Sequence, residues 1–190
     1  MTAADLFSRI VALLDGVGIP YMLTGSFAGA YHGRSRATQD IDFVIAPTAA
    51  QLHALTAQLP PTEFYVDTDA ALDALRHESL FNVVDLKTGW KVDFICRKSR
   101  PFSRAEFERR TRVELLGIAL HIATAEDLLL AKLEWAKLGG SLRQVEDAAG
   151  LLQVAGDALD LSYIERWVGE LGIGDQWSQA LRAAGREPAE

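Results

Sequence analysis

The sequence predicts an α/β (α+β) fold, in which a mixed central sheet flanked by helices is followed by a C-terminal helical section. Short apolar runs alternate with helix-like segments up to residue 123, whereas only helical patterns follow from Thr124. Apolar residues make up 49% of the 190 residues, which is enough to form a core. We therefore expect an α/β domain at residues 1–123 and a helical section at residues 124–185 that packs on it.

The elements of the α/β domain follow from local patterns. An apolar stripe predicts an amphipathic first helix at residues 3–14, and further helices are expected at 27–31, 48–58, 69–76 and 103–110. Strands are expected at 21–23, 41–45, 63–66, 80–86, 91–95, 113–116 and 120–122. The turn at residues 87–89 predicts an antiparallel hairpin, and Ser103 with Glu106 fits a helix capping box.

The helical section is expected to contain helices at residues 124–138, 141–154, 162–168 and 175–184. Gly139 and Gly140 separate the first two, and Ser141 is expected to cap the second. Trp135, Trp167 and Trp177 fall within these helices and are predicted to be core residues.

Composition excludes several classes of protein. The formal net charge of −7 argues against a protein that coats nucleic acid over its whole surface. Cys96 is the only cysteine, so neither an intramolecular disulfide nor a cysteine-rich zinc site is expected. The N-terminal residues lack the pattern of a signal peptide, and no apolar stretch approaches a membrane span, so we expect a cytoplasmic protein without membrane contact.

Three aspartates are the candidate catalytic residues. Asp40 and Asp42 flank Ile41 at the start of a predicted strand, where residues two apart point to the same face. Asp93 lies between Val92 and Phe94 on a later strand, and an acid in such surroundings needs a partner. Clustered carboxylates are ligands that magnesium prefers, so we predict that Asp40, Asp42 and Asp93 bind Mg²⁺.

The segment before these acids predicts a phosphate site. Gly25 and Ser26 lie between a short strand and a short helix, where glycine allows a phosphate to approach the backbone and serine adds a hydroxyl donor. Arg34 and Arg36, just before Asp40, could neutralise further phosphate charge.

Together these parts suit nucleotidyl transfer. The reaction needs in-line attack on an α-phosphate, and two metal ions can hold the attacking and leaving oxygens. Asp40 and Asp42 would bridge two Mg²⁺ ions, with Mn²⁺ as the alternative ion. Asp93 would complete the site of the catalytic ion and help to deprotonate the acceptor hydroxyl.

An Asp-x-Asp pair alone is weak evidence, because about one is expected by chance in a chain of this composition. A second pair, Asp67 and Asp69, falls at a predicted turn and is interpreted as the N-cap of the next helix. The alternatives for the candidate residues are solvated strand-end carboxylates for Asp40 and Asp42, a buried salt-bridge partner for Asp93, and a plain turn at Gly25 and Ser26.

The stretch from Thr24 to Ile45 resembles the signature of the DNA polymerase β-type nucleotidyltransferase superfamily. That signature is a Gly-Gly or Gly-Ser pair, then a gap of about a dozen residues, then two aspartates flanking one apolar residue. Here the gap spans residues 27–39, and Asp93 matches the third carboxylate. The pattern Arg36-x-Thr-x-Asp40-Ile-Asp42 is most similar to the small bacterial abortive-infection toxin-like members.

The resemblance implies a nucleotidyltransferase fold and an NTP substrate such as ATP. It also implies a hydroxyl acceptor on RNA such as tRNA, on a protein or on a small molecule, and a role as the toxin of a toxin–antitoxin pair with a cognate antitoxin. Lys132 and Arg143 match basic residues that family members place near the phosphates and base. The alternatives are a solvated helix residue for Lys132 and a surface ion pair between Arg143 and Asp147. Many toxin members have a larger C-terminal domain, which leaves the acceptor and the toxin role open.

A basic segment follows the Asp93 strand, with seven lysines and arginines between Arg97 and Arg112. Such a segment could bind an RNA acceptor, with Phe102 and Phe107 stacking on bases, but we favour a solvated helix with Phe107 in the core. His32 is a weak candidate for substrate contact. Two rival functions stay open: a catalytically idle nucleotidyltransferase-fold module that binds a nucleotide or a partner, and a metal-dependent phosphohydrolase.

Overall fold

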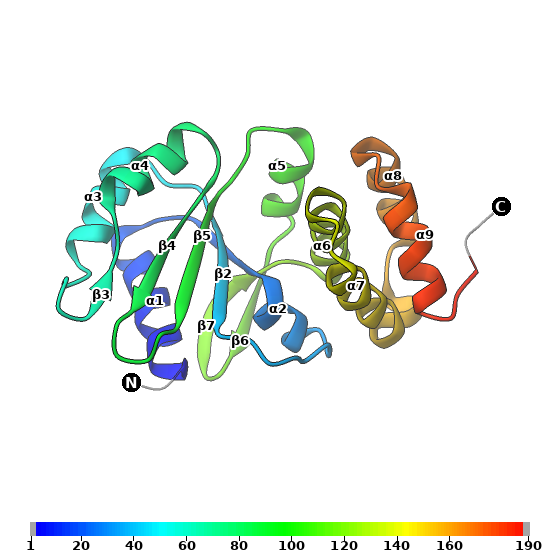
Figure 1. Ribbon diagram of the computed structural model, residues 1–190, viewed down its shortest axis with the longest axis horizontal. Helices are drawn as coiled ribbons and strands as arrows, with labels where there is room; N and C mark the ends of the chain where they lie inside the picture. The colour runs from blue at the N-terminus through cyan, green and yellow to red at the C-terminus, as the bar shows by residue number, and fades with distance from the viewer. Residues whose placement is uncertain (1–2, 188–190) are drawn as a thin grey trace. The chain divides into compact units, whose positions relative to one another are not determined.

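The structure, a computed structural model, describes residues 3–187 and contains a seven-stranded mixed sheet (Figure 1). The strand order is β3-β4-β5-β2-β1-β7-β6. The strands are β1 Tyr21–Thr24, β2 Asp40–Ile45, β3 Phe64–Tyr65, β4 Leu80–Asp85, β5 Lys91–Cys96, β6 Thr111–Leu115 and β7 Ile118–Ile122. The helices are α1 Ala3–Val17, α2 Gly25–Tyr31, α3 Ala49–Ala57, α4 Thr68–Arg76, α5 Pro101–Glu108, α6 Ala125–Gly139, α7 Leu142–Ala155, α8 Leu161–Leu171 and α9 Gly174–Ala183, with a 3-10 turn η1 at Gly156–Ala158.

The described chain forms two compact units. Residues 3–27 and 37–123 make the sheet unit, and residues 28–36 and 124–187 make the helical unit. The segment 28–36, which joins the Gly25-Ser26 pair to the Asp40 strand in sequence, therefore groups with the C-terminal helices. The predicted α/β (α+β) class with a mixed sheet is confirmed, since β1 and β2 are antiparallel while β2 and β5 are parallel.

One face of the sheet unit carries the core. Helices α1, α3 and α4 lie on that face (Figure 1). A row of phenylalanine rings crosses it, because alternate residues of β2, β5 and β4 point the same way. Phe7 of α1 stacks on Phe27 at 5.7 Å and on Phe43 at 6.0 Å, and Phe94 continues the row. This burial leaves the polar residues of β2 and β5 on the opposite face.

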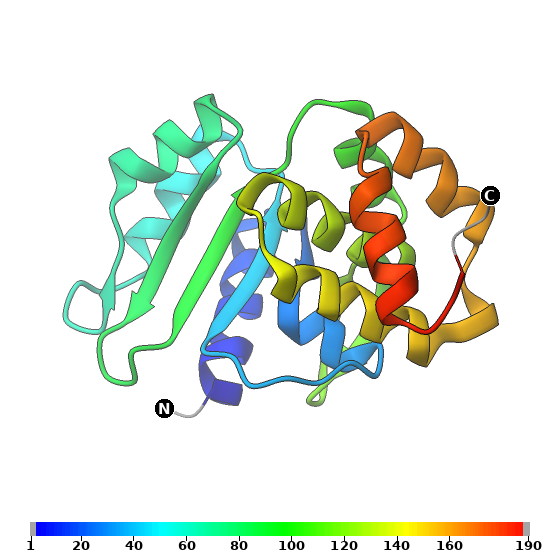
Figure 2. The ribbon, with the colours of Figure 1, turned by 45° about the vertical axis from the view of Figure 1, so that its right-hand side comes forward.

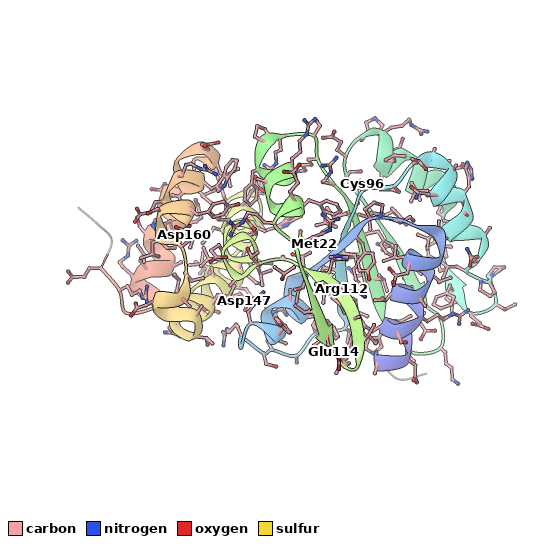
Figure 3. The ribbon with its side chains drawn as sticks, turned by 180° about the vertical axis from the view of Figure 1, so that it is seen from behind. Met22, Cys96, Arg112, Glu114, Asp147 and Asp160 are labelled. Atoms are coloured by element: carbon pink, nitrogen blue, oxygen red, sulfur yellow. The ribbon has the colours of Figure 1, made fainter. Side chains whose placement is uncertain are left out.

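The helical unit is built around α6 and α7, which lie side by side (Figure 2). Leucines on both helices are buried, and Trp167 and Trp177 pack into the same unit. The Tyr163 hydroxyl of α8 donates to Asp127 of α6 at 2.6 Å, and the Lys137 ammonium donates to the Gly172 carbonyl at the end of α8 at 2.9 Å. Helix α8 begins at its N-cap Asp160, which Figure 3 labels together with Asp147 of α7.

Three local predictions need correction. Helix α5 begins earlier than expected, with Arg100 as N-cap and Pro101 in its first turn, so Ser103 accepts a hydrogen bond from Arg100 Nε instead of capping the helix. Trp135 is 47% exposed and does not belong to the core. The pair Asp67 and Asp69 does cap α4, but the capping side chain is Asp67, which accepts from the amides of Asp69 and Ala70.

Most element boundaries lie close to the expected ones. The hairpin of β4 and β5 is antiparallel as predicted, and β6 and β7 form a second antiparallel pair. Ser141 is the N-cap residue of α7, although its side chain makes no capping hydrogen bond. Within residues 3–187, no helix combines the length and the apolar character that crossing a membrane requires.

Candidate active site

The three candidate acids lie on one face of two neighbouring strands. Asp40 and Asp42 are two residues apart on β2, so they share a face. Strand β5 is parallel to β2, and its Asp93 is in register with Asp42. Registered residues on paired strands lie about 4.8 Å apart and point the same way. The topology thus brings together three carboxylates that the sequence separates by up to fifty-three positions.

The row through Asp42 extends across four strands. Thr24 of β1 pairs with Asp42 on one side, and Asn82 of β4 pairs with Asp93 on the other. Asp40, Asp42 and Asp93 are half-buried, and Asn82 is exposed. This face of the sheet is therefore polar and partly open, in contrast to the phenylalanine face.

Lys91 adds a cation to the three acids. It lies two residues before Asp93 on β5 and is in register with Asp40. Its Nζ is 2.8 Å from Asp93 Oδ2 and 3.5 Å from Asp40 Oδ1. The hydrogen bond to Asp93 raises the pKa of Lys91, burial opposes this effect, and the charges of Asp93 and Asp40 reinforce it.

The donor chemistry fits a divalent cation. Asp93 Oδ1 is buried and has no hydrogen-bond partner among the described residues, and a buried carboxylate oxygen in this condition is costly. Across residues 3–187, no three His, Cys, Asp or Glu side chains are already arranged as a metal-binding group. Two of the three carboxylates contact the Lys91 ammonium.

Gly25 lies directly against this carboxylate group. It has a φ of +64°, and a Cβ added there would be 1.9 Å from Asp42 Oδ2. Only glycine combines this left-handed backbone with the absence of a side chain. The backbone of Gly25 therefore lies directly beside the Asp42 carboxylate, and no side chain separates the two. Ser26, the next residue, is buried in the first turn of α2.

Arg36, Lys132 and Arg143 belong to the helical unit. Asp147 of α7 is the shared partner of Arg36 and Lys132. Its Oδ2 accepts from Lys132 Nζ of α6 at 2.9 Å and from Arg36 Nε at 3.0 Å (Figure 3 labels Asp147). The side chains of Lys132 and Asp147 are 6% and 4% exposed. Burial alone would raise the pKa of Asp147, but Lys132 and Arg36 together hold it below its ordinary value.

These contacts correct two alternatives. Lys132 is not a solvated helix residue, because it is buried and also lies 3.5 Å from Gln144 Oε1. Asp147 does not form a surface pair with Arg143, which is exposed on α7. Arg36, which is predicted to bind phosphate, contacts Asp147 of α7 through its Nε. One turn after Asp147, Gly150 leaves room for Arg34, whose Nε would be 2.3 Å from a Cβ at that position.

The basic segment does not offer its aromatic rings to bases. Phe102 and Phe107 are both buried. The Arg110 guanidinium lies 4.2 Å and that of Arg97 5.6 Å from the centre of the Phe107 ring. The favoured interpretation, with Phe107 in the core, is confirmed. His32 is half-buried in the helical unit, where its ring lies 5.2 Å from that of Tyr31.

Lys91 is the residue that the sequence pattern did not single out. The signal was present, because a lysine two positions before Asp93 on a strand must share its face. The contact with Asp40 had no such local signal, since it depends on the register between β2 and β5.

Comparison with known proteins supports the fold. No protein-family profile matches the chain, and no curated protein sequence matches it. Among solved structures, an antigenic nucleotidyltransferase-like protein from Paracoccidioides brasiliensis is similar, with a TM-score of 0.54 and 18% identity over 98% of this chain and 94% of that one. ANT(2")-Ia in complex with adenylyl-2"-tobramycin has a TM-score of 0.60 and 15% identity over 90% of this chain and 98% of that one.

The chain therefore has a nucleotidyltransferase fold, and the resemblance found in residues 24–45 is confirmed at that level. In each comparison the similarity extends over nearly the whole of both chains. The solution structure of the antibiotic-resistance factor ANT(2")-Ia is also similar, with a TM-score of 0.50 over 90% of this chain and 96% of that one. The narrower resemblance to the abortive-infection branch stays a prediction.

Proposed function

We propose that the protein is a magnesium-dependent nucleotidyltransferase that moves a nucleoside monophosphate from an NTP to a hydroxyl acceptor. The observation that carries the proposal is the arrangement of Asp40, Asp42 and Asp93 on one open sheet face with the Gly25 backbone against Asp42. An isolated acidic pair at a strand end would have neither the third carboxylate in register nor the glycine beside it.

The reaction balances with the groups present. The acceptor oxygen forms a bond to the α-phosphorus, the bond from that phosphorus to the bridging oxygen breaks, and pyrophosphate leaves with the electron pair. The acceptor proton passes to a carboxylate, for which Asp93 is the candidate because its Oδ1 has no other hydrogen-bond partner. Mg²⁺, or Mn²⁺ in its place, held by the three acids would neutralise the phosphate charge that develops.

The main chain at Gly25 has a separate role in this proposal. A triphosphate can approach a backbone that carries no side chain, and the amides of Gly25 and Ser26 at the start of α2 are the proposed donors to its oxygens. Arg36, Lys132 and Arg143 were expected to bind the triphosphate. Arg36 and Lys132 each contact Asp147 through one nitrogen and have further N–H donors, and Arg143 is exposed, so all three stay proposed ligands of the triphosphate.

The ligand of one similar structure supports transfer of a nucleotidyl group to an acceptor. ANT(2")-Ia was crystallised with adenylyl-2"-tobramycin, in which the nucleotidyl group is joined to a small molecule. For this chain the acceptor stays one of three classes: RNA such as tRNA, a protein, or a small molecule. The buried Phe102 and Phe107 give no support to base stacking, so the basic segment does not favour RNA over the other two. The toxin role and a cognate antitoxin, which the sequence resemblance implies, stay proposals.

One labelling experiment tests the function. The protein is incubated with each α-³²P-labelled NTP, Mg²⁺ and separate fractions of cellular RNA, protein and small metabolites, and the products are separated by gel and thin-layer chromatography. We expect a labelled acceptor together with pyrophosphate. Free phosphate without a labelled acceptor would favour the phosphohydrolase instead.

Matched variants connect the label to the site. Asp42→Asn and Asp93→Asn should each lower labelling by about 100-fold or more, because a neutral amide neither neutralises a cation nor accepts the acceptor proton. Asp69→Asn is the control, since it belongs to the other Asp-x-Asp pair and is exposed on α4. Nucleotide binding that survives in every variant, with no labelled product from the wild type, would identify the idle binding module.

A further inference from the structure

The contact between Lys91 and two of the candidate metal ligands carries an inference about how the site is held before a metal ion arrives. Lys91 Nζ lies 2.8 Å from Asp93 Oδ2 and 3.5 Å from Asp40 Oδ1. Three carboxylates gathered on adjacent strands repel one another unless a cation lies among them. In the described structure that cation is the Lys91 ammonium.

The side chain of Lys91 is partly exposed and flexible enough to move away from Asp40 and Asp93. It is 36% exposed, whereas that of Asp93 is 15% exposed. A lysine side chain is a flexible four-carbon stem that carries a well-hydrated point charge. Its strand neighbour on the far side is Val84, which has no charge to hold it.

A divalent cation and this ammonium need the same carboxylate oxygens. Asp93 Oδ2 and Asp40 Oδ1 both face Lys91, and Asp93 Oδ1 is buried without a hydrogen-bond partner among the described residues. A divalent ion has twice the charge and prefers several carboxylate oxygens at short distance. Binding of the ion through Asp40 Oδ1 and Asp93 Oδ2 therefore requires that Lys91 gives up its contacts.

We propose that Lys91 is a positioning residue that acts as the internal counter-ion of the site: it holds Asp40 and Asp93 together in the metal-free protein, and a divalent cation displaces it. This inference rests on the proposed function. Lys91 thereby sets the metal concentration at which the site fills, because the affinity for the ion is reduced by the competing ammonium.

Metal binding to the intact protein tests the proposal directly. Mn²⁺ affinity is measured by electron paramagnetic resonance for the wild type, for Lys91→Met and for the control Lys87→Met, which removes the same charge from the exposed turn beside β5. Removal of the competing ammonium should tighten the Kd of Lys91→Met by about five-fold or more, because the ion no longer has to displace it. Lys87→Met should bind like the wild type.

A second readout needs no variant. Acetic anhydride labels exposed lysines, and peptide mass spectrometry gives the extent of labelling at each position. We expect labelling of Lys91 to rise when Mn²⁺ is added, whereas that of Lys87 stays constant.

Thermal melting of the variants gives a third readout. In the presence of EDTA, Lys91→Met should melt at a lower temperature than Lys87→Met, and Mn²⁺ should raise the melting temperature of Lys91→Met more than that of the wild type.

The outcomes separate the two proposals. If the wild type binds Mn²⁺ but Lys91→Met binds it equally or more weakly, and Lys91 labelling does not rise with Mn²⁺, the counter-ion role is wrong while the proposed function stands. If neither protein binds Mn²⁺ in the presence or absence of an NTP, the metal-dependent function is wrong and the role of Lys91 is overturned with it.

Discussion

The Gly25 backbone and the Asp42 carboxylate are in such close contact that a methyl group at Gly25 would place its carbon 1.9 Å from Asp42 Oδ2. That distance lies far inside van der Waals contact, so a residue with a side chain must displace Asp42 or the start of α2. The positive φ of +64° adds backbone strain for any other residue. The Gly-Ser pair and the Asp-x-Asp pair of the motif are thus two halves of one packed contact.

The first prediction uses this contact. Gly25→Ala should abolish transfer, because Asp42 cannot keep its place, and should lower the free energy of unfolding by more than the ~1 kcal/mol that the positive φ alone costs. The control is Gly89→Ala, whose φ of +74° is similar but whose added Cβ meets nothing within 4 Å. Urea unfolding and the nucleotidyl-labelling assay measure both effects. Equal stability losses and equal activities for the two variants would disprove a specific contact with Asp42.

The second prediction concerns the buried ion pair that joins α6 and α7. Lys132→Met leaves the carboxylate of Asp147 buried with only Arg36 as a charged partner, and breaking a buried pair in this way typically costs about 3–5 kcal/mol. Replacing both residues, with Lys132→Met and Asp147→Leu, should cost less than the single change. The control Glu170→Gln removes an exposed pair with Arg166 and should change stability by less than about 1 kcal/mol.

Chemical denaturation of the four proteins measures these costs. A double variant that is less stable than Lys132→Met would show that the pair contributes net stability beyond the penalty of an isolated charge. Transfer activity of Lys132→Met then separates a structural role from the expected role at the triphosphate, since a purely structural lysine would leave KM for the NTP unchanged in the folded variant.

The third prediction is a dependence of stability on pH. Asp147 has a folded-state pKa below its ordinary value of 3.8, so its ionised form favours the folded state. This contribution is complete above the ordinary pKa, declines as the pH falls below it, and is lost once the pH has passed the lowered folded value. The stability difference between the wild type and Asp147→Asn should therefore shrink as the pH falls from 7 toward about 3. Urea unfolding at a series of pH values gives that difference, and a difference that grows toward acid pH would contradict the assignment.

The fold class and the three acids were predictable because each depends on local pattern. Alternating apolar residues mark β2 and β5, and the Gly-Ser pair followed by Asp-x-Asp marks the start of the site. The register that sets Asp42 beside Asp93 was not predictable in this way. A parallel pairing of distant strands is determined by non-local packing, here by the phenylalanine rings of Phe43 and Phe94 on the opposite face.

Where local pattern misled, a longer-range contact overrode it. Arg143 and Asp147 have the spacing of a helical surface pair, but Asp147 is turned inward to Lys132 and Arg36 from other segments. The capping box at Ser103 fits its residues, yet Pro101 begins α5 earlier. A lysine on a strand is usually solvated. The contact of Lys91 with Asp93 could be read from their spacing, whereas its contact with Asp40 depends on the register between β2 and β5.

The last prediction uses Cys96, the end residue of β5 (labelled in Figure 3), three positions after Asp93. Cys96 is the only cysteine of the chain, it is buried, and burial raises the pKa of its thiol to about 11. At pH 8 the native thiol should react with a disulfide reagent at least about 100-fold more slowly than the unfolded chain, because little thiolate is present and access is blocked. Rapid reaction in native buffer would mean that the C-terminal end of β5 opens readily. The same assay on Asp93→Asn shows whether a loss of activity comes from the missing carboxylate or from a disturbed strand.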